Sequence, residues 1–453
     1  MQRDLTRGPV VRVMLAFALP MVVGNMLQQL YNVADTYIVS RFIGPDALGA
    51  VGSSFTLMNF LLSIVIGLCM GGGALFAMLF GNGQEEELKS VLFLSFLFTG
   101  AVALVVNVLV LCFLDPVLVL MRFPPENIDL ARDYLRVVLL GVLFSFLYNF
   151  FAAFLRSVGN SLVPLLFLVV SALLNIVLDL ACILLWDMGV AGAALATVIS
   201  QGVSAVCIAV YSYARSPLLR LERRHMRFDR QRMGTIVQFS TLTSVQQSVM
   251  NFGILMIQSL VNSFGPAVMA AFAAAVKVDA FAYQPAQDFG NAFSLFISQN
   301  YGAKKPDRIQ KGIRSAVATS VLFCIAVSAL VVLFARQLML LFVRPEETEI
   351  IAAGIRYLRI EGSFYWGIGC LFLLYGLYRG IGRPGMSVVL TIASLGTRVV
   401  LAYALAPIPA FGLPAIWWAI PIGWVLADAV GFGYYYLRVR KTLLASGGPP
   451  ETK

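Results

Sequence analysis

A polar stripe crosses an apolar stretch near the N-terminus. The stretch at 18–44, ALPMVVGNMLQQLYNVADTYIVSRFIG, is apolar enough to cross a membrane. Gln28, Asn32 and Asp35 follow one another at i, i+4 and i+7, so a helix places them on one face. An acid at membrane depth costs roughly 2.5–3.5 kcal/mol, and acids found there usually serve a function. We therefore predict that Asp35 binds a cation whose movement is coupled to transport. The simpler alternative is a polar side chain that hydrogen-bonds to a neighbouring helix.

The same helix contains a proline. Pro20 lies fifteen residues before Asp35 and removes one backbone hydrogen bond from the helix. Sharp helix bends occur mostly at such positions. We predict that Pro20 is a hinge.

Composition places these residues in a polytopic membrane protein. Hydrophobic residues make up 59% of the 453 residues, charged residues only 12%, and the mean hydropathy is +0.85. Soluble domains contain roughly 25% charged residues. The apolar runs predict about twelve helices of ~20 or more residues, and the first is expected to be an uncleaved span. We place them at 10–41, 46–80, 88–120, 128–155, 161–186, 189–214, 234–263, 267–301, 308–343, 348–378, 385–407 and 411–437.

The net charge of +10 is better explained by membrane topology than by nucleic acid. Most of the lysines and arginines fall in segments on the same side as the N-terminus, which predicts that both termini are cytoplasmic. The six cysteines lie inside apolar runs without CxxC spacing, and His225 is the sole histidine. We expect no disulfide, no metal centre and no cofactor.

The chain contains an internal repeat. IGPDALGAVGSSF at 43–55 aligns with FGPAVMAAFAAAV at 264–276, an offset of 221 residues. Further along, the offset becomes 223. The segments that match there are Tyr134–Arg136 with Tyr357–Arg359, Arg156–Gly159 with Arg379–Gly382, and Gly189 with Gly412. Together these matches indicate a duplication.

Each half contains six predicted spans, so both halves enter the membrane from the same side. We therefore predict an all-α fold of two six-helix bundles, related as parallel repeats by a pseudo-twofold axis and flanking a central cleft. The predicted parts are an N-terminal bundle at 1–214, a basic cytoplasmic linker at 215–233, a C-terminal bundle at 234–440 and a cytoplasmic tail at 441–453.

The opening PMVVGNMLQQLYNVADTYIVSRFIGPDALGAVG and the repeated Y-L-R…R-x-x-G segments resemble the MATE family of multidrug and toxic compound extrusion transporters. The resemblance implies a twelve-helix antiporter that exports lipophilic, often cationic compounds in exchange for H⁺ or Na⁺. Within this family, the sequence is similar to a bacterial and archaeal branch of DinF type. That branch implies a cation site, with Na⁺ as one candidate ion, at Asp35, Asn175, Asp179 and Thr197, and a bend at Pro20. Another branch uses carboxylates on helices seven and ten, but 234–263 and 362–378 contain no Asp or Glu.

Helix rise allows these residues to meet. At ~1.5 Å per residue, Asp35, Asp179 and Thr197 all fall in the outer half of the membrane. Asn175 is one turn from Asp179 on the same face. Two nearby carboxylates in a low-dielectric cavity cannot both stay ionised cheaply, and a bound H⁺ or Na⁺ relieves their repulsion.

The second half lacks these ligands. At the repeat offsets Asn175 corresponds to Arg398, which would repel a cation from the second bundle. We infer a single coupling site, in the N-terminal half. In the alternative interpretation, the side chain of Arg398 extends toward the boundary between membrane and water, or it pairs with Asp428. The other replacements are Met256 for Asp35, Ala402 for Asp179 and Ile420 for Thr197.

Other polar and pliable residues are candidates for a substrate cavity, since flexible and aromatic surfaces accept varied ligands. They are Gln28, Asn32, Gln246, Met250, Asn251 and Tyr283. Lys277 shares the eighth span with Asp279 and Asp288, and we expect it to form a structural ion pair. The roles of Asp279, Glu361 and Arg398 stay open at this point.

The sequence favours a transporter in a bacterial inner membrane, acting as a monomer on small lipophilic or cationic compounds, without a nucleic-acid partner. One alternative keeps the architecture but moves lipid-linked saccharides, for which Lys277 and Arg398 would bind pyrophosphate. A membrane-embedded enzyme lacks the metal cluster or Ser/Lys dyad that it would need, and an ATP-driven pump lacks GxxxxGK[ST]. A channel fits a duplicated chain less well than two moving halves do.

Overall fold

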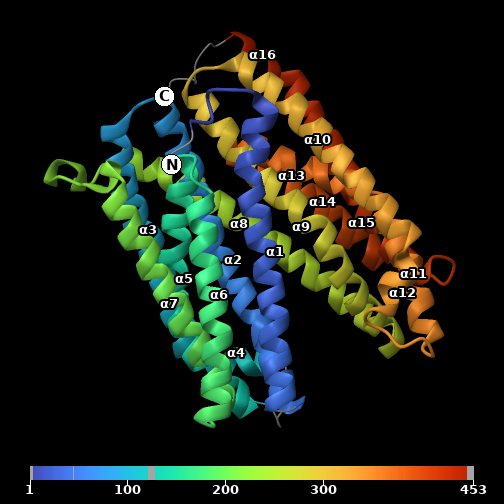
Figure 1. The fold of residues 1–453 in the computed structure, drawn as a ribbon. Helices are drawn as coiled ribbons and strands as arrows, with labels where there is room; N and C mark the ends of the chain where they lie inside the picture. The colour runs from blue at the N-terminus through green and yellow to red at the C-terminus, as the bar shows by residue number, and fades with distance from the viewer. Residues whose placement is uncertain (1–3, 44, 121–127, 446–453) are drawn as a thin grey trace. The chain divides into compact units, whose positions relative to one another are not determined.

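The computed structural model describes residues 4–43, 45–120 and 128–445, and within these ranges no strand occurs (Figure 1). The helices of the first half are α1 (Val10–Phe42), α2 (Pro45–Gly81), α3 (Glu85–Cys112), α4 (Leu114–Leu120), α5 (Ile128–Ser157), α6 (Leu162–Leu180), η2 (Ala181–Leu185) and α7 (Gly189–Arg215). The linker contains η3 (Pro217–Leu219) and η4 (Arg223–Met226). The second half contains α8 (Arg230–Asn262), α9 (Pro266–Gly302), α10 (Pro306–Leu333), α11 (Ala335–Leu340), α12 (Thr348–Gly362), α13 (Tyr365–Gly380), α14 (Pro384–Leu405), α15 (Gly412–Tyr434), η5 (Tyr435–Val439) and α16 (Arg440–Ala445).

The twelve predicted spans are confirmed as helices or as pairs of consecutive helices. Ten helices in the described part of the chain are long and apolar enough to cross a membrane, and α12 with α13 forms one more span bent by 51°. The remaining span is α8, whose 33 residues are long enough to cross. Its many Gln, Ser and Thr residues lower its mean hydropathy below that of the others. The fold is therefore an all-α polytopic membrane protein.

Two predicted spans are each divided at one phenylalanine. Phe113 separates α3 from α4, and Phe334 separates α10 from α11. The two residues are 221 positions apart and have similar backbone angles, φ −109° and ψ 26° against φ −103° and ψ 19°. The break is thus a feature that the two halves share.

The repeat is also present in the backbone of the loops. Gly159 and Gly382 follow the repeated arginines and have φ of 82° and 79°. Gly189 and Gly412 are the first residues of α7 and α15 and have φ of 56° and 50°. Glycine adopts these left-handed angles without the strain that a side chain would add, which explains why both copies keep it.

Contacts divide the chain into two compact units. The first contains Met1–Asp4 and Val23–Ser244, and the second contains Leu5–Val22 and Val245–Lys453. Helices α1 and α8 each contribute residues to both units, so these units do not follow the boundaries expected at 214 and 234. The predicted tail lies largely outside the described residues, which end at 445.

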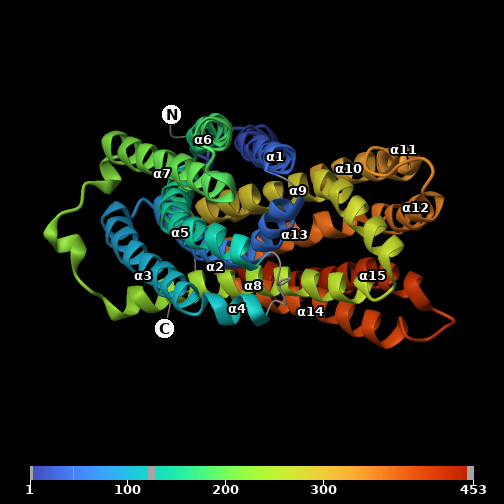
Figure 2. The same cartoon turned by 90° about the horizontal axis from the view of Figure 1, so that it is seen from below.

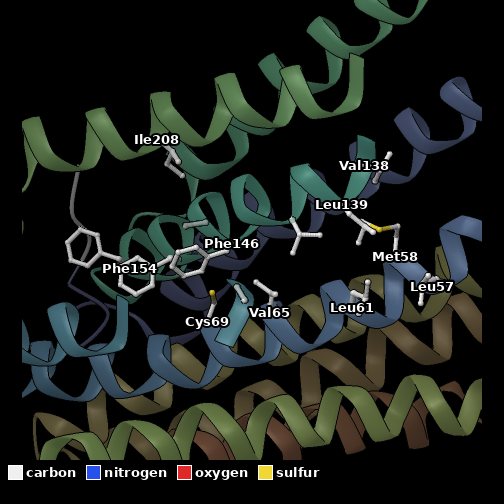
Figure 3. Packing of buried hydrophobic residues seen from close by; sticks show 14 of the residues in the cluster. Leu57, Met58, Leu61, Val65, Cys69, Val138, Leu139, Phe146, Phe154 and Ile208 are labelled. Carbon is white, nitrogen blue, oxygen red and sulfur yellow. The ribbon is translucent and has the colours of Figure 1, made fainter. Parts of the chain in front are cut away.

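The core of the first unit is built by α2, α5 and α7 (Figure 3). Leu61, Val65 and Leu139 are almost completely buried in this cluster. Helix α2 also approaches α8 closely, because a Cβ atom at Gly71 would lie 2.3 Å from the carbonyl oxygen of Phe239. The glycine run at 71–73 therefore permits close packing, as its position in an apolar span suggests.

The second unit holds the beginning of the chain by backbone hydrogen bonds. Leu5 is fully buried, and its N–H donates to Gln299 Oε1 at 3.0 Å. Lys305 Nζ donates to the Thr6 carbonyl at 2.9 Å, and Arg308 donates to the Gly8 carbonyl oxygen at 2.6 Å. These bonds fix the N-terminal segment to α9 and α10. In both views of this unit α14 and α15 run side by side (Figure 2).

Candidate cation-coupling site

The four residues of the predicted cation site all belong to the first unit. Asp35 is on α1, Asn175 and Asp179 are on α6, and Thr197 is on α7. Helix α6 lies between α7 and the second part of α1 (Figure 2). Asn175 and Asp179 are one helical turn apart, so both face the same neighbours.

The structure brings these side chains together. The carboxyl groups of Asp35 and Asp179 lie within hydrogen-bonding distance of one another. Asn175 Nδ2 donates to Asp179 Oδ2 at 2.9 Å, and its Oδ1 accepts from the Thr197 N–H at 3.3 Å. The Thr197 hydroxyl donates to the Ala193 carbonyl oxygen at 3.1 Å. Asp179 has no exposed surface and Asn175 is 1% exposed.

This acid pair has no positive partner. Within the described ranges no salt bridge involves Asp35 or Asp179, and one carboxylate oxygen of each is buried without a hydrogen bond. Two carboxyl groups can hydrogen-bond to each other only if one of them carries a proton. If both were ionised, two charges about 4 Å apart would repel by about 4 kcal/mol at an effective dielectric constant of about 20. The pocket is therefore suited to one monovalent cation.

Two tyrosines next to the acids were missed in the sequence. Tyr31 hydrogen-bonds to Thr197 and interacts electrostatically with Asp35 and Asp179. Tyr134 interacts with the same two acids. Both tyrosines could have been found from the sequence. Tyr31 is four residues before Asp35 on the same helical face, and Tyr134 begins the repeated Y-L-R segment.

The predicted hinge lies near the boundary between the units. Pro20 is inside α1, which continues without interruption to Phe42. The part of α1 up to Val22 packs in the second unit and the part from Val23 in the first. The hinge itself stays a prediction.

The substrate-cavity candidates are distributed over both units. Gln28 and Asn32 are in the first, and Gln246, Met250, Asn251 and Tyr283 are in the second. Gln246 is 3% exposed, and its Oε1 has no hydrogen-bond partner. The ring of Tyr283 stacks on that of Phe372 with centroids 5.9 Å apart. The cavity stays a prediction.

A second buried acid pair lies in the second unit. The hydroxyl of Tyr357 donates to Asp279 Oδ2 at 2.6 Å, and the hydroxyl of Tyr365 donates to Asp279 Oδ1. Glu361 hydrogen-bonds to Asp279 through its side chain. The bend between α12 and α13 lies between Glu361 and Tyr365, so both residues can approach α9. Sequence spacing does not predict this cluster, because its members come from three separate helices.

Arg398 belongs electrostatically to this second cluster. Its guanidinium group interacts with both Asp279 and Glu361. The alternative pairing with Asp428 is not formed, since both carboxylate oxygens of Asp428 lack hydrogen-bond partners. The expected ion pair of Lys277 is likewise not found among the described residues, where its Nζ lies 5.7 Å from the centre of the Phe342 ring instead. Phe342 follows the end of α11, so the Lys277 side chain reaches the segment between α11 and α12.

Neither cluster resembles a metal centre of acids, histidines and cysteines. No group of three such residues in the described ranges could hold a metal ion. A monovalent ion at Asp35 and Asp179 would rely on carboxylate, amide and hydroxyl oxygens.

Two sets of six spans, each enclosing a buried acid pair, define a duplicated membrane transporter fold. The family model described as MatE matches the chain twice, at residues 20–181 and 243–404. The chain belongs to the MATE family. Both ends of the second match lie 223 residues beyond those of the first, which confirms the predicted repeat.

Proteins similar to this chain include named drug transporters. The chain is 28% identical over 438 residues to the "Probable multidrug resistance protein YoeA" of Bacillus subtilis, covering 95% of this chain and 94% of that protein. It is 24% identical to the multidrug export protein MepA of Staphylococcus aureus, covering 96% of each. A solved outward-facing structure of a multidrug resistance MATE family transporter superposes with a TM-score of 0.90 at 27% identity, covering 97% of this chain and 98% of that one.

Proposed function

We propose that this chain is a multidrug efflux antiporter that exports lipophilic or cationic compounds in exchange for H⁺ or Na⁺. Support for the cargo comes from the relatives named as multidrug resistance and export proteins. Support for the exchange comes from one observation, the buried Asp35–Asp179 pair without a positive partner.

The coupling follows from electrostatics. A bound cation removes most of the repulsion between Asp35 and Asp179, so the state with the ion and the state without it differ by several kcal/mol. Asn175 holds Asp179 in place through its amide, and Thr197 holds Asn175. A cationic substrate competes for the same negative charge, or for the same conformation of the two halves. Export and ion entry therefore alternate as the halves move.

The membrane potential supplies enough energy for this exchange. One charge that moves inward across about 100 mV releases about 2.3 kcal/mol. This corresponds to roughly fifty-fold accumulation of a neutral substrate. The protein acts as a monomer in the bacterial inner membrane, with both termini in the cytoplasm.

The test uses the full-length protein in liposomes with ethidium as the fluorescent cation. A pH gradient and a Na⁺ gradient are imposed separately. Wild-type protein is expected to export ethidium with one of these gradients, and Asp35→Asn and Asp179→Asn are expected to abolish gradient-driven export.

Asp115→Asn serves as the matched control, because Asp115 is an exposed acid in the same unit that pairs with Arg132. It is expected to export like wild type. Gradient-driven export by Asp35→Asn at the wild-type rate would refute the assignment of the site. Wild-type protein that moves no drug under either gradient would refute the proposed function.

A further inference from the structure

A groove opens on the second unit at a distance from the acid clusters. It has a volume of about 500 Å³ and is enclosed by α10, α13 and η5 together with the end of α15. Helix α13 packs against both α10 and α15, and its residue Leu377 contributes to the lining. Such a volume is in the range of small-ligand sites.

The groove follows one face of α10. Six of its lining residues on this helix recur at i, i+3, i+4, i+7, i+8 and i+11, which is the spacing of a single helical face. They are Arg314, Val317, Ala318, Val321, Leu322 and Ile325, and Ile313 next to Arg314 lines the groove as well. From Arg314 to Ile325 the helix rises by ~16 Å, close to half of the ~30 Å hydrocarbon core of a bilayer. The apolar wall is therefore about as long as one leaflet is deep.

Charge is confined to one end of this wall. Among the described residues that line the groove, Arg314 is the only charged one. Arg440 also reaches this end, because both arginines interact electrostatically with Tyr435 and the Arg440 guanidinium lies 5.9 Å from the centre of the Tyr436 ring. No salt bridge of either arginine occurs in the part of the chain that the structure describes.

The tyrosines mark the level of the membrane surface. Tyrosine is enriched at the boundary between hydrocarbon and water, and Tyr435 and Tyr436 both line the charged end of the groove. A π-helix begins at Tyr435, and such turns often occur at functional positions. The side chain of Leu322, lower in the groove, is 72% exposed, as expected for contact with acyl chains.

We propose that this groove binds an anionic phospholipid. One acyl chain lies along the apolar face of α10, and the phosphate is held by Arg314 and Arg440 with the tyrosines beside it. Charge complementarity selects an anionic headgroup, since two unpaired cations stand at the mouth and no acid lines the groove among its described residues. The length of the apolar wall selects a lipid over a compact drug molecule.

Native mass spectrometry of the full-length protein in detergent tests this proposal. The protein is titrated with palmitoyl-oleoyl phosphatidylglycerol or with the phosphatidylcholine of the same chains. Wild-type protein is expected to retain one phosphatidylglycerol in clear preference to phosphatidylcholine. Each arginine should contribute about fivefold to this preference, so Arg314→Ala with Arg440→Ala should reduce it about 25-fold. Equal retention of the two lipids by wild-type protein would overturn the proposal.

Two further variants separate the groove from general attraction to the surface. Ala318→Trp fills the groove without changing its charge and should abolish the retained lipid, whereas Ala326→Trp, on an exposed part of α10 outside the groove, should not. Arg438→Ala removes an exposed charge from η5 that does not line the groove and should leave the preference unchanged. Loss of preference in Arg438→Ala equal to that in Arg314→Ala, or undiminished retention in Ala318→Trp, would contradict the assignment.

Discussion

Each half of the duplicated chain contains one pair of carboxylic acids that hydrogen-bond to each other, but the paired acids come from different helices. In the first unit they are on α1 and α6, and in the second they are on α9 and α12. The position equivalent to Asp279 in the first half is Met58, and the position equivalent to Glu361 is Val138. The two clusters therefore occupy different positions on a common framework.

Both clusters contain a tyrosine at the same position of the repeat. Tyr134 and Tyr357 are 223 residues apart, and each lies next to the acids of its own unit. Their surroundings differ in the helix that carries them. Helix α5 is continuous through the region of Tyr134, whereas the corresponding span in the second half bends by 51° after Gly362. The bend brings Tyr365 to Asp279 as a second donor.

The clusters also differ in how their charge is balanced. Asn175 in the first half occupies the position of Arg398 in the second. Among the described residues the first cluster forms no salt bridge, whereas Arg398 interacts electrostatically with both acids of the second. Under the proposed function, the first cluster takes up a cation from outside, whereas the second has a positive side chain of its own.

The largest expected effect is on transport. Substitution of Asp35 or Asp179 by asparagine should reduce gradient-driven accumulation from roughly fifty-fold to none, because the repulsion that the cation relieves is gone. The double variant should be no worse than either single one, since the acids act as a unit. Ethidium efflux from liposomes measures this. Partial accumulation by each single variant that is lost only in the double variant would argue that the two acids bind separate ions.

The next effect concerns Arg398. Replacement by methionine leaves Asp279 and Glu361 without their positive charge and should lower the free energy of unfolding by roughly 3 kcal/mol. Chemical unfolding in detergent measures the loss. Glu361→Gln combined with the methionine variant should recover much of it, because the remaining acid is then alone. Unchanged stability in Arg398→Met would show that the second cluster is not neutralised by this residue.

The two equivalent tyrosines should respond unequally to loss of the hydroxyl. Tyr357→Phe removes a hydrogen bond to a charged group and should destabilise the protein by about 1.5–3 kcal/mol. Tyr134→Phe should cost less than about 0.5 kcal/mol, because its hydroxyl forms no hydrogen bond to the acids within the described residues. Thermal unfolding of both variants in the same detergent compares them. Equal losses would contradict the difference between the clusters.

The smallest effect is expected at an exposed ion pair. Arg132 Nε lies 2.6 Å from Asp115 Oδ1, but the Asp115 side chain is 62% exposed. Asp115→Asn should change the free energy of unfolding by at most about 1 kcal/mol, because water and salt screen the pair. The same unfolding assay checks this. A loss comparable with that of Arg398→Met would remove the distinction between buried and exposed charge.

Much of the architecture could be predicted from the sequence, because membrane spans appear as apolar runs and repeats as recurring short motifs. The apolar runs located all twelve spans, and the repeated glycines marked loops whose positive φ angles only glycine adopts easily. The breaks at Phe113 and Phe334 were not predicted. Polar residues follow both of them, Asp115-Pro116 and Arg336-Gln337, but the apolar sequence resumes beyond, so that each break fell inside one predicted span.

The two clusters differ in how far they could be predicted. Asp35 was predicted from the polar stripe on its own helix, and resemblance to a family joined it with Asn175, Asp179 and Thr197. No short-range pattern connects Asp279, Glu361 and Arg398, which meet only through the packing of α9, α12 and α14. The sequence therefore suggested Asp428 as a partner of Arg398 and predicted an ion pair for Lys277 that is not found among the residues that the structure describes.

The hydrogen bonds at the start of the chain give α1 a role that its length alone would not suggest. Arg308 and Lys305 secure the residues before α1 to the second unit, while Asp35 near the other end of the same helix contacts α6 in the first. One uninterrupted helix thus joins a segment held by the second unit to an acid that meets α6 in the first. Under the proposed function, a force that cation binding exerts at Asp35 would either bend α1 near Pro20 or be transmitted along the helix to the residues that Arg308 and Lys305 hold.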